Sequence, residues 1–125
     1  MILVDTSVWI DHLHSTESHL VDLLGMDEVG CHPLVIEELA LGSIKDRATV
    51  LDLLGSLRGF PNVGHEELLL MVDRGHLWGR GLSAVDAHLM AAVLIEGGQM
   101  WTRDKRLRAA CTDHGVPLFD DAARR

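Results

Sequence analysis

Short, mostly apolar runs alternate along the chain with longer segments in which apolar residues recur every three or four positions. The runs occupy residues 2–4, 28–31, 99–101 and 116–119. An apolar run of this length is typical of a strand buried on both faces of a sheet. The last run contains Pro117, which donates no backbone hydrogen bond, so we expect this strand at an edge of the sheet.

The longer segments predict helices, because helical spacing brings their apolar residues onto one face. They cover residues 5–14, 15–25, 33–42, 46–57, 65–77, 83–96 and the segment from 102 to about 114. Thr6 or Ser7 is expected to cap the first helix and Ser83 the sixth, whereas residues 58–62 are predicted to form a turn or connection. Strands that alternate with helices predict an α/β fold with a mostly parallel sheet of four or five strands, covered by helices on both faces.

Length and composition predict one folded domain spanning residues 1–125. The 47% share of hydrophobic residues excludes a disordered chain. Cys31 and Cys111 form no CxxC motif, so a reduced protein is the simpler interpretation. Met1 leads directly into the first apolar run, and no run is long enough to cross a bilayer. We therefore expect a soluble, cytoplasmic protein without a membrane partner.

The formal net charge of −8 argues against broad, nonspecific binding of nucleic acid, which needs a basic surface. It does not exclude a phosphodiester substrate, because carboxylates that hold divalent cations create a pocket that attracts phosphate. The net negative charge therefore argues against a broad basic surface for nucleic acid, but it leaves a nucleic acid possible as the substrate.

Four carboxylates stand at positions whose neighbours are otherwise apolar. Asp5 directly follows the first strand, Asp104 comes soon after a later strand, and Glu38 and Asp86 lie in apolar helices. Each has a simple structural alternative. The three aspartates suit a helix N-terminus, and Glu38 with its neighbour Glu37 suits a solvated helix face.

Taken together, the four positions indicate a metal site. The carboxyl ends of parallel strands meet at one edge of a sheet, so Asp5 and Asp104 should lie close together, and Asp86 opens the helix that leads to the same strand. Carboxylates that converge in this way repel one another unless cations are bound, and oxygen ligands favour Mg²⁺ or Mn²⁺ over zinc. Ser7 and Thr102 are candidates for supporting the carboxylates or metal-bound water.

Four blocks of sequence contain these carboxylates. They are VDTSVWI at residues 4–10, ELALG at 38–42, LSAVDAHL at 82–89 and WTRDKRL at 101–107. The blocks resemble those of PIN-domain ribonucleases in order and spacing, and the short chain is most similar to the VapC toxins of bacterial type II toxin–antitoxin systems. The Glu-Leu-x-x-Gly pattern within them selects Glu38 rather than Glu37.

The resemblance implies a three-layer α/β fold and a metal-dependent endoribonuclease. It assigns Asp5, Glu38, Asp86 and Asp104 as the acidic quartet that holds Mg²⁺ or Mn²⁺. It also implies a structured RNA substrate such as a tRNA or rRNA, a VapB-like antitoxin that blocks the site, and a homodimer.

Other interpretations have weaker support in the sequence. The eight histidines include no pair with the i, i+4 spacing of a zinc helix. A haloacid-dehalogenase-like phosphatase also places an aspartate after its first strand, but Ser7 stands where its second aspartate is needed. A PIN-like binding module without turnover is the third alternative, and an activity assay separates it from an enzyme.

Residues outside the quartet leave further roles open. The basic cluster from Arg103 to Arg108 either contacts substrate phosphates or is simply solvated. Arg80, in a glycine-rich loop before Ser83, is a candidate for contact with RNA, whereas Trp78 in the same loop is expected to pack against the protein.

Overall fold

Four short strands form a parallel sheet in the computed structural model of the chain, which describes residues 1–121. They are β1 (Ile2–Val4), β2 (Val29–Cys31), β3 (Arg58–Gly59) and β4 (Gln99–Trp101). Their order across the sheet is β3-β2-β1-β4, and each neighbouring pair runs parallel. β1 is therefore central, with its Leu3 level with Gly30 of β2 and Met100 of β4.

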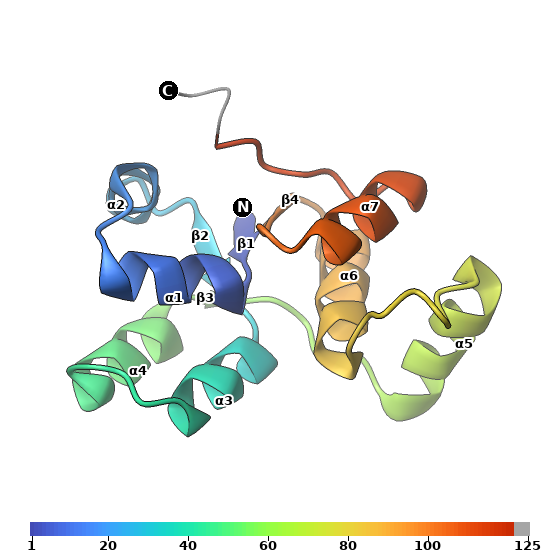
Figure 1. Cartoon of the computed structure of the whole chain (residues 1–125), viewed down its shortest axis with the longest axis horizontal. Coiled ribbons are helices and arrows are strands. Elements are labelled where there is room, and N and C mark those ends of the chain that lie inside the picture. Colours follow the sequence, from blue (N-terminus) through green and yellow to red (C-terminus); the bar gives the residue numbers. More distant parts are fainter. Residues whose placement is uncertain (122–125) are drawn as a thin grey trace.

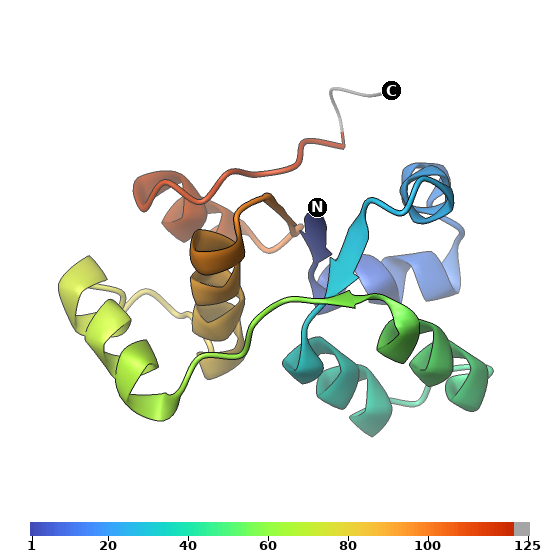
Figure 2. The same cartoon turned by 180° about the vertical axis from the view of Figure 1, so that it is seen from behind.

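Seven helices flank the sheet within residues 1–121. They are α1 (Thr6–His14), α2 (Ser18–Gly25), α3 (Pro33–Leu41), α4 (Arg47–Ser56), α5 (His65–Gly75), α6 (Ala84–Glu96) and α7 (Lys105–Asp113). Figure 1 shows α1 to α4 gathered on one side of the strands and α5 to α7 on the other. In the opposite view, Figure 2 shows the segment after β3 crossing from the first group of helices to α5. The predicted α/β fold, with a parallel sheet between helices, is confirmed.

The segment 58–62, predicted as a turn or connection, begins with β3, a strand that the sequence pattern does not predict. Both residues of β3 are exposed, so no apolar run marks this strand in the sequence. It exists because β2 offers it a free edge, at which Gly30 pairs with Arg58 and the Phe60 amide donates to the Cys31 carbonyl at 2.8 Å. Pairing with a neighbour, and not local sequence, thus defines this strand.

The predicted last strand, residues 116–119, is reduced to a single bridge between Leu118 and Met100. The Met100 amide donates to the Pro117 carbonyl at 2.8 Å, and the Phe119 amide donates to the Met100 carbonyl at 2.8 Å. This segment lies beside β4 at the edge of the sheet, where the proline nitrogen needs no partner.

The core is built from apolar residues of the sheet and of both groups of helices. Trp9, Trp101 and Phe119 are each 1% exposed, and the rings of Trp101 and Phe119 lie 4.8 Å apart. The apolar sequence of α6 is explained by its burial, since the five consecutive residues from Leu89 to Val93 are all buried. Within residues 1–121, no helix combines the length and the apolar character that a membrane span requires.

The first helix begins at the carboxyl end of the central strand. Asp5 has an extended backbone and its side chain accepts from the Thr6 amide, so Asp5 is the N-cap of α1, and the prediction of Thr6 or Ser7 as the cap is wrong by one or two residues. Because the strands are parallel, the ends of β1 and β4 open onto one edge of the sheet. Asp5 and Thr102 follow these two strands directly.

The approach of Gly98 to Met1 yields a prediction about the start of β4. Gly98 has a φ of +96°, and a Cβ there would overlap the carbonyl oxygen of Met1, which accepts from the Gln99 amide at 3.1 Å. Gly98→Ala should therefore disturb the pairing of β4 with β1 and lower the free energy of unfolding by about 3 kcal/mol.

The matched control for this change is Gly115→Ala. Gly115 also has a positive φ, +71°, but open space surrounds its Cα, so the loss should be only about 1 kcal/mol. Urea unfolding followed by circular dichroism measures both variants. Equal losses would show that the contact with Met1 does not matter.

Candidate active site at the carboxyl edge of the sheet

Asp5 ends the central strand and is buried, with only 6% of its surface exposed. Its Oδ1 accepts from the Thr6 amide at 2.8 Å. Its Oδ2 accepts from the hydroxyl of Ser7 at 2.9 Å and from that of Thr102 at 2.7 Å. A buried carboxylate requires such donors because it has lost its water. Ser7 and Thr102, the two candidates for supporting roles, thus both contact Asp5.

Thr102 links Asp5 to Asp104. Its hydroxyl donates to Asp5 and accepts from the Asp104 amide at 3.1 Å, so it is satisfied both as a donor and as an acceptor. Asp104 is the N-cap of α7, and its Oδ1 accepts from the amides of Arg106 and Leu107 at 2.9 and 3.1 Å. Asp104 is therefore a helix cap that a single threonine connects to the buried carboxylate.

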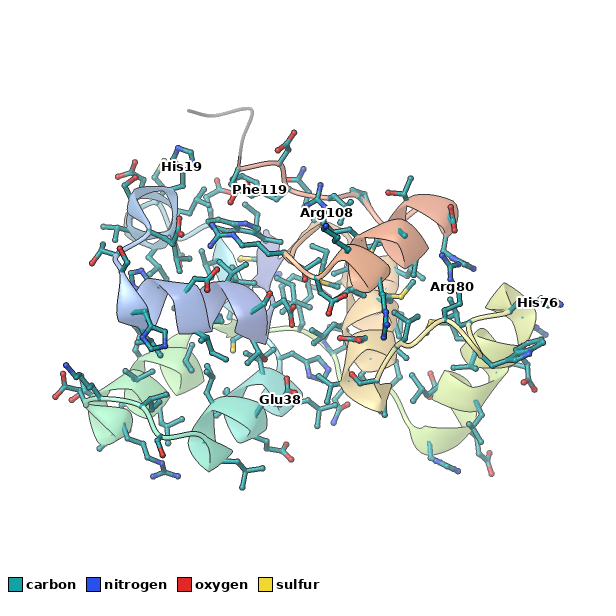
Figure 3. The ribbon with its side chains drawn as sticks, in the orientation of Figure 1. His19, Glu38, His76, Arg80, Arg108 and Phe119 are labelled. Atoms are coloured by element: carbon teal, nitrogen blue, oxygen red, sulfur yellow. The ribbon has the colours of Figure 1, made fainter. Side chains whose placement is uncertain are left out.

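Glu38 reaches the same edge of the sheet from α3, and Figure 3 shows it near the centre of the molecule. The Thr6 hydroxyl donates to Glu38 Oε1 at 2.7 Å, while the Thr6 amide donates to Asp5. Glu37 makes no hydrogen bond or ion pair with the described residues. The sequence predicts Thr6 only as a helix cap, because nothing in it marks the partner of Thr6 on α3.

Asp86 forms a capping box with Ser83 at the start of α6. The Asp86 amide donates to the Ser83 hydroxyl at 3.1 Å, and Asp86 Oδ2 accepts from the Ser83 amide at 3.0 Å. The pKa of Asp86 is raised, first by burial and further by the negative charges of Asp5 and Asp104, although the hydrogen bonds from Ser83 oppose this change. The structure thus places Asp86 within electrostatic reach of both Asp5 and Asp104.

The oxygen atoms of this site fit a hard divalent cation in their chemistry. Glu38, Asp86 and Asp104 each use one carboxylate oxygen in the bonds above, and the other oxygen has no hydrogen bond from residues 1–121. Carboxylate oxygens are the ligands that Mg²⁺ and Mn²⁺ prefer. In the described part of the chain, however, no three His, Cys, Asp or Glu side chains are already grouped as a metal-binding set. These side chains therefore match a divalent cation in ligand type and in charge, although each already accepts hydrogen bonds from the start of a helix.

Arg103 is tied to three carboxylates and is not free for a substrate. Its Nη1 donates to Asp11 at 2.7 Å and to Glu17 at 2.8 Å, and its Nη2 donates to Asp121 at 2.7 Å. The hydrogen bond from Arg103 lowers the pKa of Glu17, and the same bond raises the pKa of Arg103. Arg103 therefore joins the end of β4 to α1, to the start of α2 and to Asp121, which follows the segment that pairs with β4.

The remaining basic residues of the cluster divide into two kinds. Arg108 donates from Nη1 to the Thr102 carbonyl at 3.2 Å and so supports the loop that carries Thr102. Lys105 and Arg106 have no carboxylate partner within residues 1–121. Arg103 thus has a structural role and does not serve as a contact for substrate. For Lys105 and Arg106, both substrate contact and simple solvation stay possible.

Comparison with known proteins shows a family whose members share this arrangement of strands and helices. The PIN domain matches residues 2–112, which is most of the chain. The chain belongs to the PIN-domain family. It is 62% identical over 124 residues to ribonuclease VapC32 of two Mycobacterium tuberculosis strains, CDC 1551 / Oshkosh and H37Rv, and the match covers 98% of this chain and 100% of each relative. The resemblance to PIN-domain and VapC proteins stated from four sequence blocks is therefore confirmed.

Solved structures support the fold at much lower sequence identity. FitAcB from Neisseria gonorrhoeae superposes with a TM-score of 0.64 at 20% identity, covering 96% of this chain and 97% of that one. PAE2754 from Pyrobaculum aerophilum gives a TM-score of 0.61, also at 20% identity, over 87% of this chain and 83% of that one. At this identity, the likeness establishes the fold alone.

The dual role of Thr102 yields a prediction. Thr102→Val keeps the shape of the side chain but removes its hydroxyl, so Asp5 loses a donor and the Asp104 amide loses its acceptor. We expect the free energy of unfolding to fall by about 2 kcal/mol at neutral pH, and Thr102→Ser to restore most of it.

Thr112→Val is the matched control for this change. The Thr112 hydroxyl is exposed on α7 and donates only to the Arg108 carbonyl, at 3.1 Å, so its loss should change stability by less than about 0.5 kcal/mol. Guanidinium unfolding compares the three variants with the wild type. If Thr102→Val is as stable as Thr112→Val, the hydrogen bonds of Thr102 do not hold the site together.

Proposed function

We propose that this chain is a VapC-type toxin, a divalent-metal-dependent endoribonuclease that cleaves a structured RNA such as a tRNA or rRNA. Its membership of the PIN-domain family and its 62% identity to ribonuclease VapC32 support the reaction class. An RNA substrate and two buried, unpaired cysteines suit the cytoplasm, which we propose as its place of action.

The observation that supports this proposal most strongly is that negatively charged carboxylates lie close enough to repel one another at one edge of the sheet. Asp5 is buried and points its carboxylate at two hydroxyl groups, while burial first, and then the charges of Asp5 and Asp104, raise the pKa of Asp86. A fold that gathers negative charge in this way is stabilised by a cation, and a cation turns the same place into a site for phosphate.

Each residue of the site then has a role in hydrolysis. Asp5, Glu38, Asp86 and Asp104 would hold Mg²⁺ or Mn²⁺, which lowers the pKa of a bound water and neutralises charge on the phosphodiester. Ser7 and Thr102 would keep the Asp5 carboxylate in one orientation through their hydroxyl groups. Attack by water, and not by the ribose 2′-hydroxyl, would leave a 5′-phosphate and a 3′-hydroxyl.

The alternative of a haloacid-dehalogenase-like phosphatase is weakened by the contacts of Asp5. In such an enzyme the aspartate is a nucleophile, whereas here both Asp5 oxygens accept hydrogen bonds from the protein. Ser7, which stands in place of the second aspartate, is one of the donors. The catalytically silent binding module is tested by the activity measurement that follows.

Asp5→Asn tests the proposed metal site directly. Asparagine is as good an N-cap as aspartate, and the hydroxyls of Ser7 and Thr102 can rotate to meet its amide, so the fold should be kept. We expect cleavage of total cellular RNA in Mg²⁺ or Mn²⁺ to fall about a hundredfold or more. Sequencing of the new 5′ ends would identify the RNA and its end groups.

Asp52→Asn, at an exposed position of α4, is the control for the loss of one negative charge. It should cleave as the wild type does. The metal-dependent nuclease is contradicted if Asp5→Asn also cleaves at the wild-type rate, or if excess EDTA leaves cleavage undiminished.

Two exposed apolar surfaces fit the protein partners that we propose. A hollow of about 340 Å³ beside Glu38 is lined by Ile10 and Leu13 of α1 and by Ile44, and it would accept an apolar segment of a VapB-like antitoxin, close enough to block the carboxylates. On the far helices, Leu94 and Ile95 of α6 are 47% and 59% exposed. We propose this second surface as the homodimer interface.

A pair of lysine substitutions separates the two surfaces. Ile10→Lys should stay a toxic nuclease but escape protection by a co-expressed VapB-like antitoxin, because a charge cannot enter the apolar hollow. Leu94→Lys should still be protected but sediment as a monomer, whereas we expect the wild type to sediment as a dimer. Growth curves and analytical ultracentrifugation provide the two measurements, and a single variant that loses both properties would contradict the assignment of separate surfaces.

A further inference from the structure

Trp78 differs from the other two tryptophans of the chain. Trp9 and Trp101 are each 1% exposed and belong to the core, whereas Trp78 is 59% exposed. Trp78 stacks on His76, with ring centroids 4.6 Å apart and planes 30° from parallel. The expectation that Trp78 packs against the protein is therefore wrong for most of its surface, since a single histidine covers one face of the indole.

The loop that carries Trp78 is held in place before any ligand binds. His76, Gly79 and Gly81 have φ values of +50°, +74° and +76°, which fix three sharp changes of direction between α5 and α6. Arg80, labelled in Figure 3 with His76, donates to Asp113 of α7 at 2.7 Å, so the RNA contact considered for Arg80 competes with an ion pair. A surface fixed in this way loses little conformational entropy when a ligand binds.

A hollow of about 230 Å³ extends from Trp78 to the start of α6. Trp78 lines it together with Leu82, Ser83 and Ala84, and its remaining walls come from other residues of the same loop and from apolar residues of α5 and α6. Ser83 is the residue whose hydroxyl and amide both bond to Asp86. The hollow therefore runs from the exposed indole to the helix start that positions one of the predicted catalytic carboxylates.

A positively charged side chain lies near this hollow, although the net charge of the chain is negative. The guanidinium of Arg106 lies against Gly81, where a Cβ would come within 2.6 Å of Nη1. Arg106 has no carboxylate partner within residues 1–121, and neither has its neighbour Lys105. An unpaired guanidinium and an exposed aromatic ring, which lie at two places along the same loop, can bind a phosphate and a base of one RNA strand.

We propose that Trp78 is a stacking platform for an unpaired base of the RNA substrate, with Arg106 binding a phosphate between that base and the scissile bond. His76 supports one face of the indole, and the base covers the other. The site would favour single-stranded or looped RNA over a duplex, because only an unpaired base can present its face to the ring. This inference rests on the proposed function, and it names a binding subsite that lies outside the carboxylates.

Binding without turnover tests the platform apart from catalysis. The full chain is titrated in EDTA with an octamer of adenosine, A8, and with an abasic ribose-phosphate octamer of the same charge. Since Trp9 and Trp101 are buried, iodide should quench mainly Trp78, and Trp78→Phe supplies the background signal. We expect A8 to protect Trp78 from iodide, and the abasic octamer to leave it accessible.

Substitutions at the platform then measure its contribution. Trp78→Leu keeps an apolar side chain but cannot stack, and it should weaken A8 binding about tenfold or more, while Trp78→Phe retains most of the affinity. Arg106→Gln should weaken A8 and the abasic octamer equally and reduce the dependence of both on salt. With Mg²⁺ and total RNA, Trp78→Leu should raise KM and leave kcat near that of the wild type.

Three results would overturn the platform. One is A8 binding by Trp78→Leu with wild-type affinity, and another is equal protection of Trp78 by the abasic octamer. The third is concentration-dependent shielding of Trp78 in the protein alone, which would assign this surface to a second copy of the chain. These outcomes are distinct from failure of the nuclease, because Asp5→Asn should still bind A8 and protect Trp78 although it does not cleave.

Discussion

The buried carboxylate of Asp5 is the point on which the arrangement of this protein depends. A charge that is only 6% exposed is stable because donors replace its lost water, and these donors come from both ends of the chain. Thr6 and Ser7 belong to the helix that Asp5 itself begins, whereas Thr102 lies 97 residues away along the sequence. Satisfying one carboxylate therefore requires that β1 and β4 lie side by side, and this pairing places the ends of both strands at one edge of the sheet.

Helix capping and the gathering of negative charge are not alternatives in this fold. Asp5 caps α1, Asp104 caps α7, and Asp86 completes the capping box of α6. The N-terminus of a helix carries a partial positive charge, so three such ends reduce the repulsion among three carboxylates. The same arrangement explains why these carboxylates do not form a ready metal-binding set within residues 1–121. One oxygen of each accepts hydrogen bonds from the start of a helix.

The positive charges of the chain are divided between structure and surface. Arg103 and Arg108 follow β4 closely, and both are used to hold the segment that carries Thr102 and Asp104. Lys105 and Arg106, which lie between them in the sequence, are exposed and have no carboxylate partner within residues 1–121. A chain with a net charge of −8 can thus still present a local cationic surface beside an acidic site.

Elements that depend on local pattern can be predicted from the amino-acid sequence. Within residues 1–121, three of the four strands and all seven helices follow from apolar runs and helical spacing, and each of the four carboxylates is recognisable because it interrupts an apolar stretch. The remaining features depend on which distant segments the fold brings together. β3 is a strand only because β2 leaves an edge free, and Thr6 reaches Glu38 only because α1 and α3 pack together. Likewise, Arg103 is bound by acids that lie far from it in the sequence, and Trp78 is exposed on a loop whose Arg80 is bound to Asp113 of α7. Hydrophobic periodicity is a property of neighbouring residues, whereas the partner of a polar side chain is set by which distant segments the fold brings together.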